Sequence, residues 1–129
     1  MSIEFKVSTV ITVSPDVIYK AWLDSVHHTQ MTGGQANVSD QVDGAFQAWD
    51  GYILGRNLKL DPGRRILQSW RTSEFKETEP DSQIEVRFEP VPDGTRMTIL
   101  HTNLPPHGTQ YEQGWVEAYF DPMKAYFEG

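Results

Sequence analysis

The C-terminal stretch, residues 109–127, constrains the fold most, because its apolar side chains cover too wide an arc to rest on one flat surface. Winding residues 111–127 as a helix at about 100° per residue gathers most of the aromatic and aliphatic side chains on one side. An ordinary surface helix needs an apolar stripe of about 100°, whereas this arc covers roughly 200° by the same winding. We therefore expect a helix that is enclosed on two sides, as a curved sheet would do. The arc contains Tyr111, Trp115, Val116, Ala118, Tyr119, Phe120, Pro122, Met123, Tyr126 and Phe127.

Local signals predict where this helix begins and where it is weak. Thr109 and Glu112 have the spacing of a capping box, in which each side chain satisfies a backbone donor beside the other residue. Pro122 lacks a backbone N–H, and its ring would press on the carbonyl of Ala118, so we expect a kink near Pro122. Gly114 weakens the helix by about 1 kcal/mol relative to alanine. Tertiary packing must therefore stabilise this helix.

The first part of the chain predicts one strand followed by two short helices. Apolar and polar residues alternate over residues 3–13, which is typical of a strand with one buried face. The Ser-Pro-Asp sequence at 14–16 supplies a helix cap, a proline at the first helical position and an acid in the first turn. The Asp-Ser pair at 24–25 favours a second helix, which the glycine pair at 33–34 should end.

The following stretch, up to residue 103, is typical of strands separated by short turns. Asp-Gly pairs at 50–51 and 93–94 are two-residue hairpin signals, and Asp-Pro-Gly at 61–63 is a turn in which proline sets the backbone angle. Short connections join antiparallel neighbours. We expect a weak strand at 36–39 and clearer strands at 44–49, 52–60, 65–72, 83–89 and 95–103.

The order of these elements predicts an α+β fold. A chain of 129 residues is the size of a single domain, so we expect one domain spanning residues 1–129. Its curved antiparallel sheet of about six to seven strands would surround the long C-terminal helix, with two short helices after the first strand.

Composition excludes several classes of function. The chain has no cysteine, which rules out disulfides and thiolate metal sites and favours a cytoplasmic protein. A formal net charge of −7 repels phosphate backbones, so we expect no nucleic-acid partner. No apolar run approaches the roughly 20 residues that cross a bilayer, so we expect no membrane association.

The motifs of metal, nucleophilic and phosphate chemistry are not found. The adjacent pair His27 and His28 would point about 100° apart on a helix, which favours a solvated helix surface over a metal site. The sequence has no Gly-x-Ser-x-Gly elbow, and its glycines match neither a phosphate-binding loop nor a dinucleotide fingerprint. We therefore expect no metal, no cofactor and no catalytic residue.

Three segments carry a resemblance to a known family. Residues 44–55 (GAFQAWDGYILG), 58–71 (LKLDPGRRILQSWR) and 114–127 (GWVEAYFDPMKAYF) resemble the heat shock protein 90 ATPase activator homologue family. That family belongs to the START-like, helix-grip superfamily, which also contains polyketide cyclases. The resemblance implies a helix-grip fold. In the eukaryotic activator this domain is the C-terminal half, and a separate N-terminal domain makes the main contact with the chaperone.

A helix held in a curved sheet leaves a space that this architecture commonly uses as an apolar pocket. The competing interpretation is a solid core, in which the same large side chains fill the interior. His101 shares strand parity with Met97 and should face inward, as a ligand-binding group, an acid or base, or a neutral buried imidazole. Arg56 shares the parity of Leu58, and an inward arginine would need an anionic partner. The candidate lining residues are Trp22, Phe46, Arg56, Leu58, Trp70, Phe88, Met97, His101, Trp115 and Tyr119.

These observations lead to one expected function and two alternatives. We expect a non-enzymatic binding domain that holds a small apolar or aromatic molecule between the C-terminal helix and the sheet. The first alternative is a co-chaperone that stimulates the chaperone's ATPase through an exposed patch around Tyr52 or Phe75. The second is a cyclase- or hydrolase-like enzyme that uses the same cavity with His101.

Overall fold

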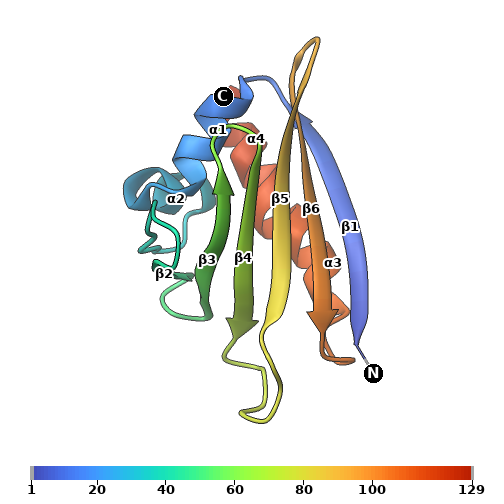
Figure 1. The fold of residues 1–129 in the computed structure, drawn as a ribbon. Helices are drawn as coiled ribbons and strands as arrows, with labels where there is room; N and C mark the ends of the chain where they lie inside the picture. The colour runs from blue at the N-terminus through green and yellow to red at the C-terminus, as the bar shows by residue number, and fades with distance from the viewer. Residues whose placement is uncertain (1, 129) are drawn as a thin grey trace.

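A computed structural model describes residues 2–128 of the chain (Figure 1). Within these residues, six strands form one antiparallel sheet in the order β1-β6-β5-β4-β3-β2. The α+β class, the curved antiparallel sheet and the long C-terminal helix are as expected, but the weak strand at 36–39 contributes only an isolated bridge between Asn37 and Gln47. The elements are β1 (Ile3–Ile11), α1 (Pro15–Trp22), α2 (Ser25–Thr32), β2 (Ala45–Ala48), β3 (Ile53–Asp61), β4 (Arg65–Thr72), β5 (Ser82–Val91), β6 (Gly94–Leu104), α3 (Gln110–Trp115), the π-helical turn η1 (Val116–Phe120) and α4 (Asp121–Glu128).

The C-terminal helix, made of α3, η1 and α4, lies across one face of the sheet, with α1 and α2 beside one end of it (Figure 1). The wide apolar arc explains this position, because side chains from two flanks of the helix are enclosed at once. Half-buried Val116, Tyr126 and Phe127 complete the same contact. The core between the layers is continuous, and the buried residues of the helix are Tyr111, Trp115, Tyr119, Phe120 and Met123.

The C-terminal helix begins without the predicted capping box. Thr109 already has helical backbone angles, and its side chain makes no capping hydrogen bond. Instead, the turn before the helix supplies the first acceptors, because the amide of Tyr111 donates to the carbonyl of Gly108 over 3.2 Å. The prediction that Thr109 and Glu112 cap each other is therefore wrong, although the helix begins at the expected place.

The predicted irregularity near Pro122 takes the form of a π-helical turn, Val116–Phe120. At its end the amide of Asp121 donates to the carbonyl of Val116, five residues earlier. This wider turn comes directly before the proline, which cannot supply the next helical hydrogen bond. Single π turns of this kind change a helix locally without ending it.

The turn between β2 and β3 is longer than the predicted two-residue hairpin, because residues 49–52 lie between the strands. Trp49, Asp50 and Gly51 have positive φ angles of 54°, 57° and 86°. Glycine and, to a lesser degree, aspartate adopt such angles readily, so it is Trp49 that must be held there by the surrounding structure. The turn places Trp49 close to the C-terminal helix.

None of the helices within residues 2–128 is both long and apolar enough to cross a lipid bilayer.

Candidate functional site

A pocket of about 260 Å³ opens between the C-terminal helix and strands β3 and β4. Small residues of the helix create its space, because a Cβ atom added at Gly114 would meet nothing within 4 Å. Aromatic rings form most of the walls. The lining residues are Trp49, Tyr52, Ile53, Trp70, Gln110, Tyr111, Gly114, Trp115, Ala118 and Tyr119.

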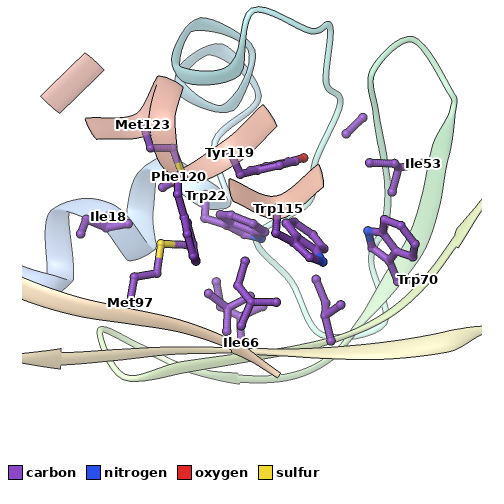
Figure 2. Packing of buried hydrophobic residues seen from close by; sticks show 14 of the residues in the cluster. Ile18, Trp22, Ile53, Ile66, Trp70, Met97, Trp115, Tyr119, Phe120 and Met123 are labelled. Carbon is purple, nitrogen blue, oxygen red and sulfur yellow. The ribbon is translucent and has the colours of Figure 1, made fainter. Parts of the chain in front are cut away.

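The inner wall consists of aromatic rings that hold one another in place (Figure 2). The ring centroids of Trp115 and Tyr119 lie 4.9 Å apart, and those of Trp115 and Trp70 lie 5.6 Å apart. Trp22 of α1 stacks behind Trp115 at 6.3 Å. Offset and tilted contacts at these distances are the favoured arrangements of aromatic pairs, so the wall is pre-formed.

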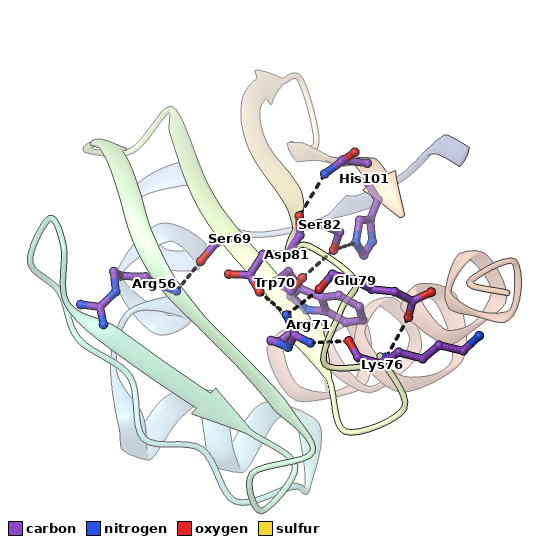
Figure 3. Close-up of polar contacts among 10 residues, drawn as sticks. Arg56, Ser69, Trp70, Arg71, Lys76, Glu79, Asp81, Ser82 and His101 are labelled. Carbon is purple, nitrogen blue, oxygen red and sulfur yellow. Dashed lines mark hydrogen bonds and ion pairs between the residues drawn. The ribbon is translucent and has the colours of Figure 1, made fainter. Parts of the chain in front are cut away.

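A chain of hydrogen bonds fixes Trp115 from behind. Its indole Nε1–H donates to Nδ1 of His101 over 3.0 Å, so the other ring nitrogen, Nε2, carries the proton. This Nε2–H donates to the hydroxyl of Ser82 over 2.9 Å, and Ser82 donates to the carbonyl of Trp70 (Figure 3). Burial lowers the pKa of His101 to about 3. The imidazole is therefore neutral, and both of its nitrogens are engaged.

A second buried histidine fixes Tyr119. His28 donates from Nδ1 to the carbonyl of Trp22 over 2.8 Å and accepts at Nε2 from the hydroxyl of Tyr119 over 3.0 Å. Burial lowers the pKa of His28 and raises that of Tyr119. The expected solvated surface is correct for His27, which is exposed, and wrong for His28, because α2 packs against the C-terminal helix.

The loop after β4 packs against two rings that line the pocket. Phe75 is buried, with its ring 6.2 Å from Trp70 and 6.2 Å from Tyr111. Arg71 ties the loop down through the carboxylate of Asp81 at 2.7 Å and two backbone carbonyls (Figure 3). The exposed interaction patch predicted around Phe75 is therefore wrong, since this ring packs inward.

Two of the tyrosines that line the pocket, Tyr111 and Tyr52, have hydroxyl groups that are already bonded. Tyr111 shares a hydrogen bond of 2.6 Å with Thr72, and Tyr52 donates to the carboxylate of Glu74. Burial and the Glu74 carboxylate raise the pKa of Tyr52. None of the residues described as lining the pocket carries a charged side chain.

The structure brings only some of the predicted site residues together. Trp70, Trp115 and Tyr119 line the pocket, while Trp22 and His101 lie directly behind its wall. The remaining inward residues belong to the core elsewhere. Phe46 packs on Gly55, and the neighbours Phe88 and Met97 are buried on β5 and β6, outside the pocket.

Arg56 and Leu58 are corrections to the predicted site. Both side chains are exposed, Leu58 at 40%, and Arg56 donates to the backbone carbonyl of Asp43 instead of a ligand. Buried Ile53 and Asn57 show that the inner face of β3 has the opposite parity. A register shift between Asn57 and Lys59 then interrupts the alternation, as a β-bulge does. The spacing of the leucines therefore predicted the wrong face of β3 for Arg56 and Leu58.

Sequence reasoning missed most of the helix and turn residues of the site. Gly114 and Ala118 line the pocket and leave space because their side chains are small. The sequence could have indicated them as two small residues among the aromatic residues of the helix. Trp49 lies in the turn before β3 and Ile53 is the first residue of β3, and the sequence indicated this turn only by an Asp-Gly pair. Within residues 2–128, no three histidine, aspartate or glutamate side chains are placed to bind a metal.

The fold and the pocket define a helix-grip domain of the START-like class. The chain belongs to the family described as activator of Hsp90 ATPase homolog 1-like proteins, whose profile matches residues 12–128.

Three relatives illustrate the range of this similarity. The activator of 90 kDa heat shock protein ATPase homolog of Dictyostelium discoideum is 27% identical over 118 residues, which cover 88% of this chain and 30% of that protein. The crystal structure of an HSP90 activator from Plasmodium falciparum has a TM-score of 0.81 at 24% identity, covering 97% of this chain and 94% of that one. The Aha1 dimer from Colwellia psychrerythraea has a TM-score of 0.80 at 16% identity, covering 95% of each chain. The chain spans only 30% to 33% of the length of the curated relatives it matches.

Proposed function

We propose that this chain is a non-enzymatic binding domain whose pocket holds a small apolar or aromatic molecule. The observation that carries this proposal is the open space beside Gly114, which is enclosed by the rings of Trp70, Trp115 and Tyr119. Ligand pockets are typically apolar cavities with a few polar groups at fixed positions. A solid core would leave no such space.

The energetics of the site favour a ligand that presents flat apolar surface. Burial of apolar surface contributes about 25 cal/mol per Å² before the costs of ordering the ligand. These costs are small on the protein side, because hydrogen bonds to His101 and His28 already hold Trp115 and Tyr119. The pocket therefore resembles a pre-organised binding site.

The same hydrogen bonds favour binding over catalysis. A general base needs a lone pair within reach of its substrate, whereas Nδ1 of His101 accepts from Trp115 and its Nε2–H is bound to Ser82. His28 is similarly occupied by Trp22 and Tyr119. Both imidazoles serve to position aromatic walls.

A substitution that fills the space tests this function. In Gly114→Phe the new ring would occupy the pocket, and replacing glycine also favours the helix, so the variant should fold. We expect saturable binding of naphthalene to the unchanged protein by isothermal titration calorimetry. Binding to Gly114→Phe should weaken by more than about tenfold, because the variant removes the enclosed space.

Gly114→Ala is the matched control, since its single methyl group leaves most of the pocket open. Its affinity for naphthalene should stay within about twofold of the unchanged protein, because no neighbour lies near the new atom. A lack of saturable binding to the unchanged protein would reject the proposed function.

A second candidate function is binding to Hsp90 with stimulation of its ATPase. The names of the relatives from Dictyostelium discoideum and Plasmodium falciparum favour it. A partner surface of this chain would lie on the outer face of β3, where Leu54 and Leu58 are 48% and 40% exposed on either side of Arg56. Exposed apolar side chains beside an arginine are typical of protein interfaces.

Two variants separate this activity from ligand binding. When the chain is added to purified Hsp90, ATP turnover should rise to a plateau. Leu54→Asp should weaken this effect by about tenfold or more, because it places a charge in an apolar contact, whereas Gly114→Phe should retain it. Unchanged ATP turnover at saturating concentration would remove the chaperone function.

A further inference from the structure

The indole N–H of Trp70 is an unpaired polar group on a buried wall of the pocket. Trp70 is only 4% exposed, yet within residues 2–128 its Nε1–H has no hydrogen-bond acceptor. By contrast, the N–H groups of Trp22 and Trp115 are bonded to Gln68 and His101. In the described part of the chain, Gln47 Oε1 is the only side-chain nitrogen or oxygen that is unpaired and also completely enclosed by other atoms. The N–H of Trp70 is unpaired but is not completely enclosed, so it must be in contact with open space.

That open space is the pocket. Trp70 is one of its lining residues, and Figure 2 shows the indole nitrogen of Trp70 on the side of the ring that faces Trp115. Edge-to-face contacts with His101 at 4.6 Å and Tyr111 at 4.9 Å hold the ring in this orientation. The donor is thus fixed in direction before any ligand arrives.

A fixed donor in an apolar pocket discriminates between ligands. A ligand without an acceptor leaves the N–H of Trp70 desolvated and unpaired, which is unfavourable. A ligand with an acceptor at this point gains a hydrogen bond and removes that cost. Discrimination by a buried polar group is therefore stronger than discrimination by shape alone.

The surroundings determine the charge of the acceptor. The lining contains no lysine or arginine, so a carboxylate or phosphate would be buried without a countercharge, which is strongly unfavourable. Tyr111 and Tyr119 are already bonded to Thr72 and His28. An uncharged oxygen, such as that of a ketone, fits these conditions.

We propose that the pocket selects aromatic molecules that carry an uncharged hydrogen-bond acceptor, which receives the N–H of Trp70 while the ring lies against Trp115 and Tyr119. This inference rests on the proposed binding function and adds the ligand's chemical class to it. Trp70 is then the residue that determines specificity, and the other aromatic residues supply the enclosure.

The test compares two probes that share one bicyclic skeleton, 1-indanone and indane, which differ by the carbonyl group. Trp70→Phe keeps an aromatic ring and removes the donor. The variant should weaken 1-indanone binding about three- to tenfold more than indane binding, which is the net effect of one neutral hydrogen bond. Ile53→Val is the control, because it removes only one methylene group from an apolar lining residue and should affect both probes equally.

A second measurement does not depend on a variant. In the unchanged protein, the indole proton resonance of Trp70 should shift downfield on addition of 1-indanone and should not do so with indane. Equal weakening of both probes by Trp70→Phe, or an equal shift of this resonance, would overturn the role of Trp70 and leave the binding function intact. If neither probe binds the unchanged protein, the proposed function fails as well.

Discussion

Replacing Trp115 by alanine should lower the free energy of unfolding by about 3–5 kcal/mol, the usual range for removing a buried tryptophan. Trp115 is buried and touches the rings of Trp22, Trp70 and Tyr119. Its loss leaves a cavity and also leaves Nδ1 of His101 without a donor. Chemical denaturation monitored by circular dichroism would measure the change.

Trp115→Phe separates the two parts of this effect. The variant retains a ring in the core but not the N–H, so it should lose less stability than the alanine variant, including about 1–3 kcal/mol for the unpaired imidazole nitrogen. If Trp115→Ala lost less than about 1 kcal/mol while its affinity for naphthalene fell, Trp115 would be a ligand wall without a packing role.

Acidification should destabilise the protein strongly between pH 6.5 and pH 3 because of His101. Its pKa is lowered by burial from 6.5 to about 3 in the folded chain, so in this interval the unfolded chain binds a proton that the folded chain does not. Stability from this group is therefore complete above pH 6.5 and is lost as the pH falls toward 3. The full effect is about 5 kcal/mol at roughly 1.4 kcal/mol per pKa unit.

The variant His101→Gln tests this assignment. A glutamine can accept from Trp115 and donate to Ser82, as the neutral imidazole does, but it does not titrate. Denaturation curves at several pH values should show a smaller slope for the variant. Part of the slope should remain, because His28 also has a lowered pKa and loses stability in the same direction. An unchanged slope would show that His101 does not control acid stability.

The overall fold was predictable because its signals are local and repeated. The apolar arc of residues 111–127 required enclosure on two sides, and the Asp-Gly pair at 93–94 joined neighbouring strands as expected. Strand β4 was predicted with its observed ends at Arg65 and Thr72. Each of these features depends on residues close in sequence, where periodicity and turn chemistry are informative.

The site was less predictable, because it depends on contacts between distant residues. Arg56 and Leu58 lie on the outer face because Ile53 and Asn57 set the parity of β3, and the register shift after Asn57 interrupts the alternation that their spacing suggests. The burial of His28 depends on Tyr119, far along the chain. The space beside Gly114 arises because neighbouring side chains do not fill it, and the sequence records only the glycine.

The π-helical turn has a consequence for chain length. It holds one residue more than regular winding would place there, so it acts as a spacer between α3 and α4. If Val116–Phe120 were regular α-helix, every residue of α4 would advance by about 100°, and Pro122 would take the enclosed position that Met123 now occupies. Deleting one residue from this segment would therefore convert it to regular helix, while Trp115 and Met123 would keep their present directions. Homologous chains can in this way differ in length without exchanging one face of the helix for another.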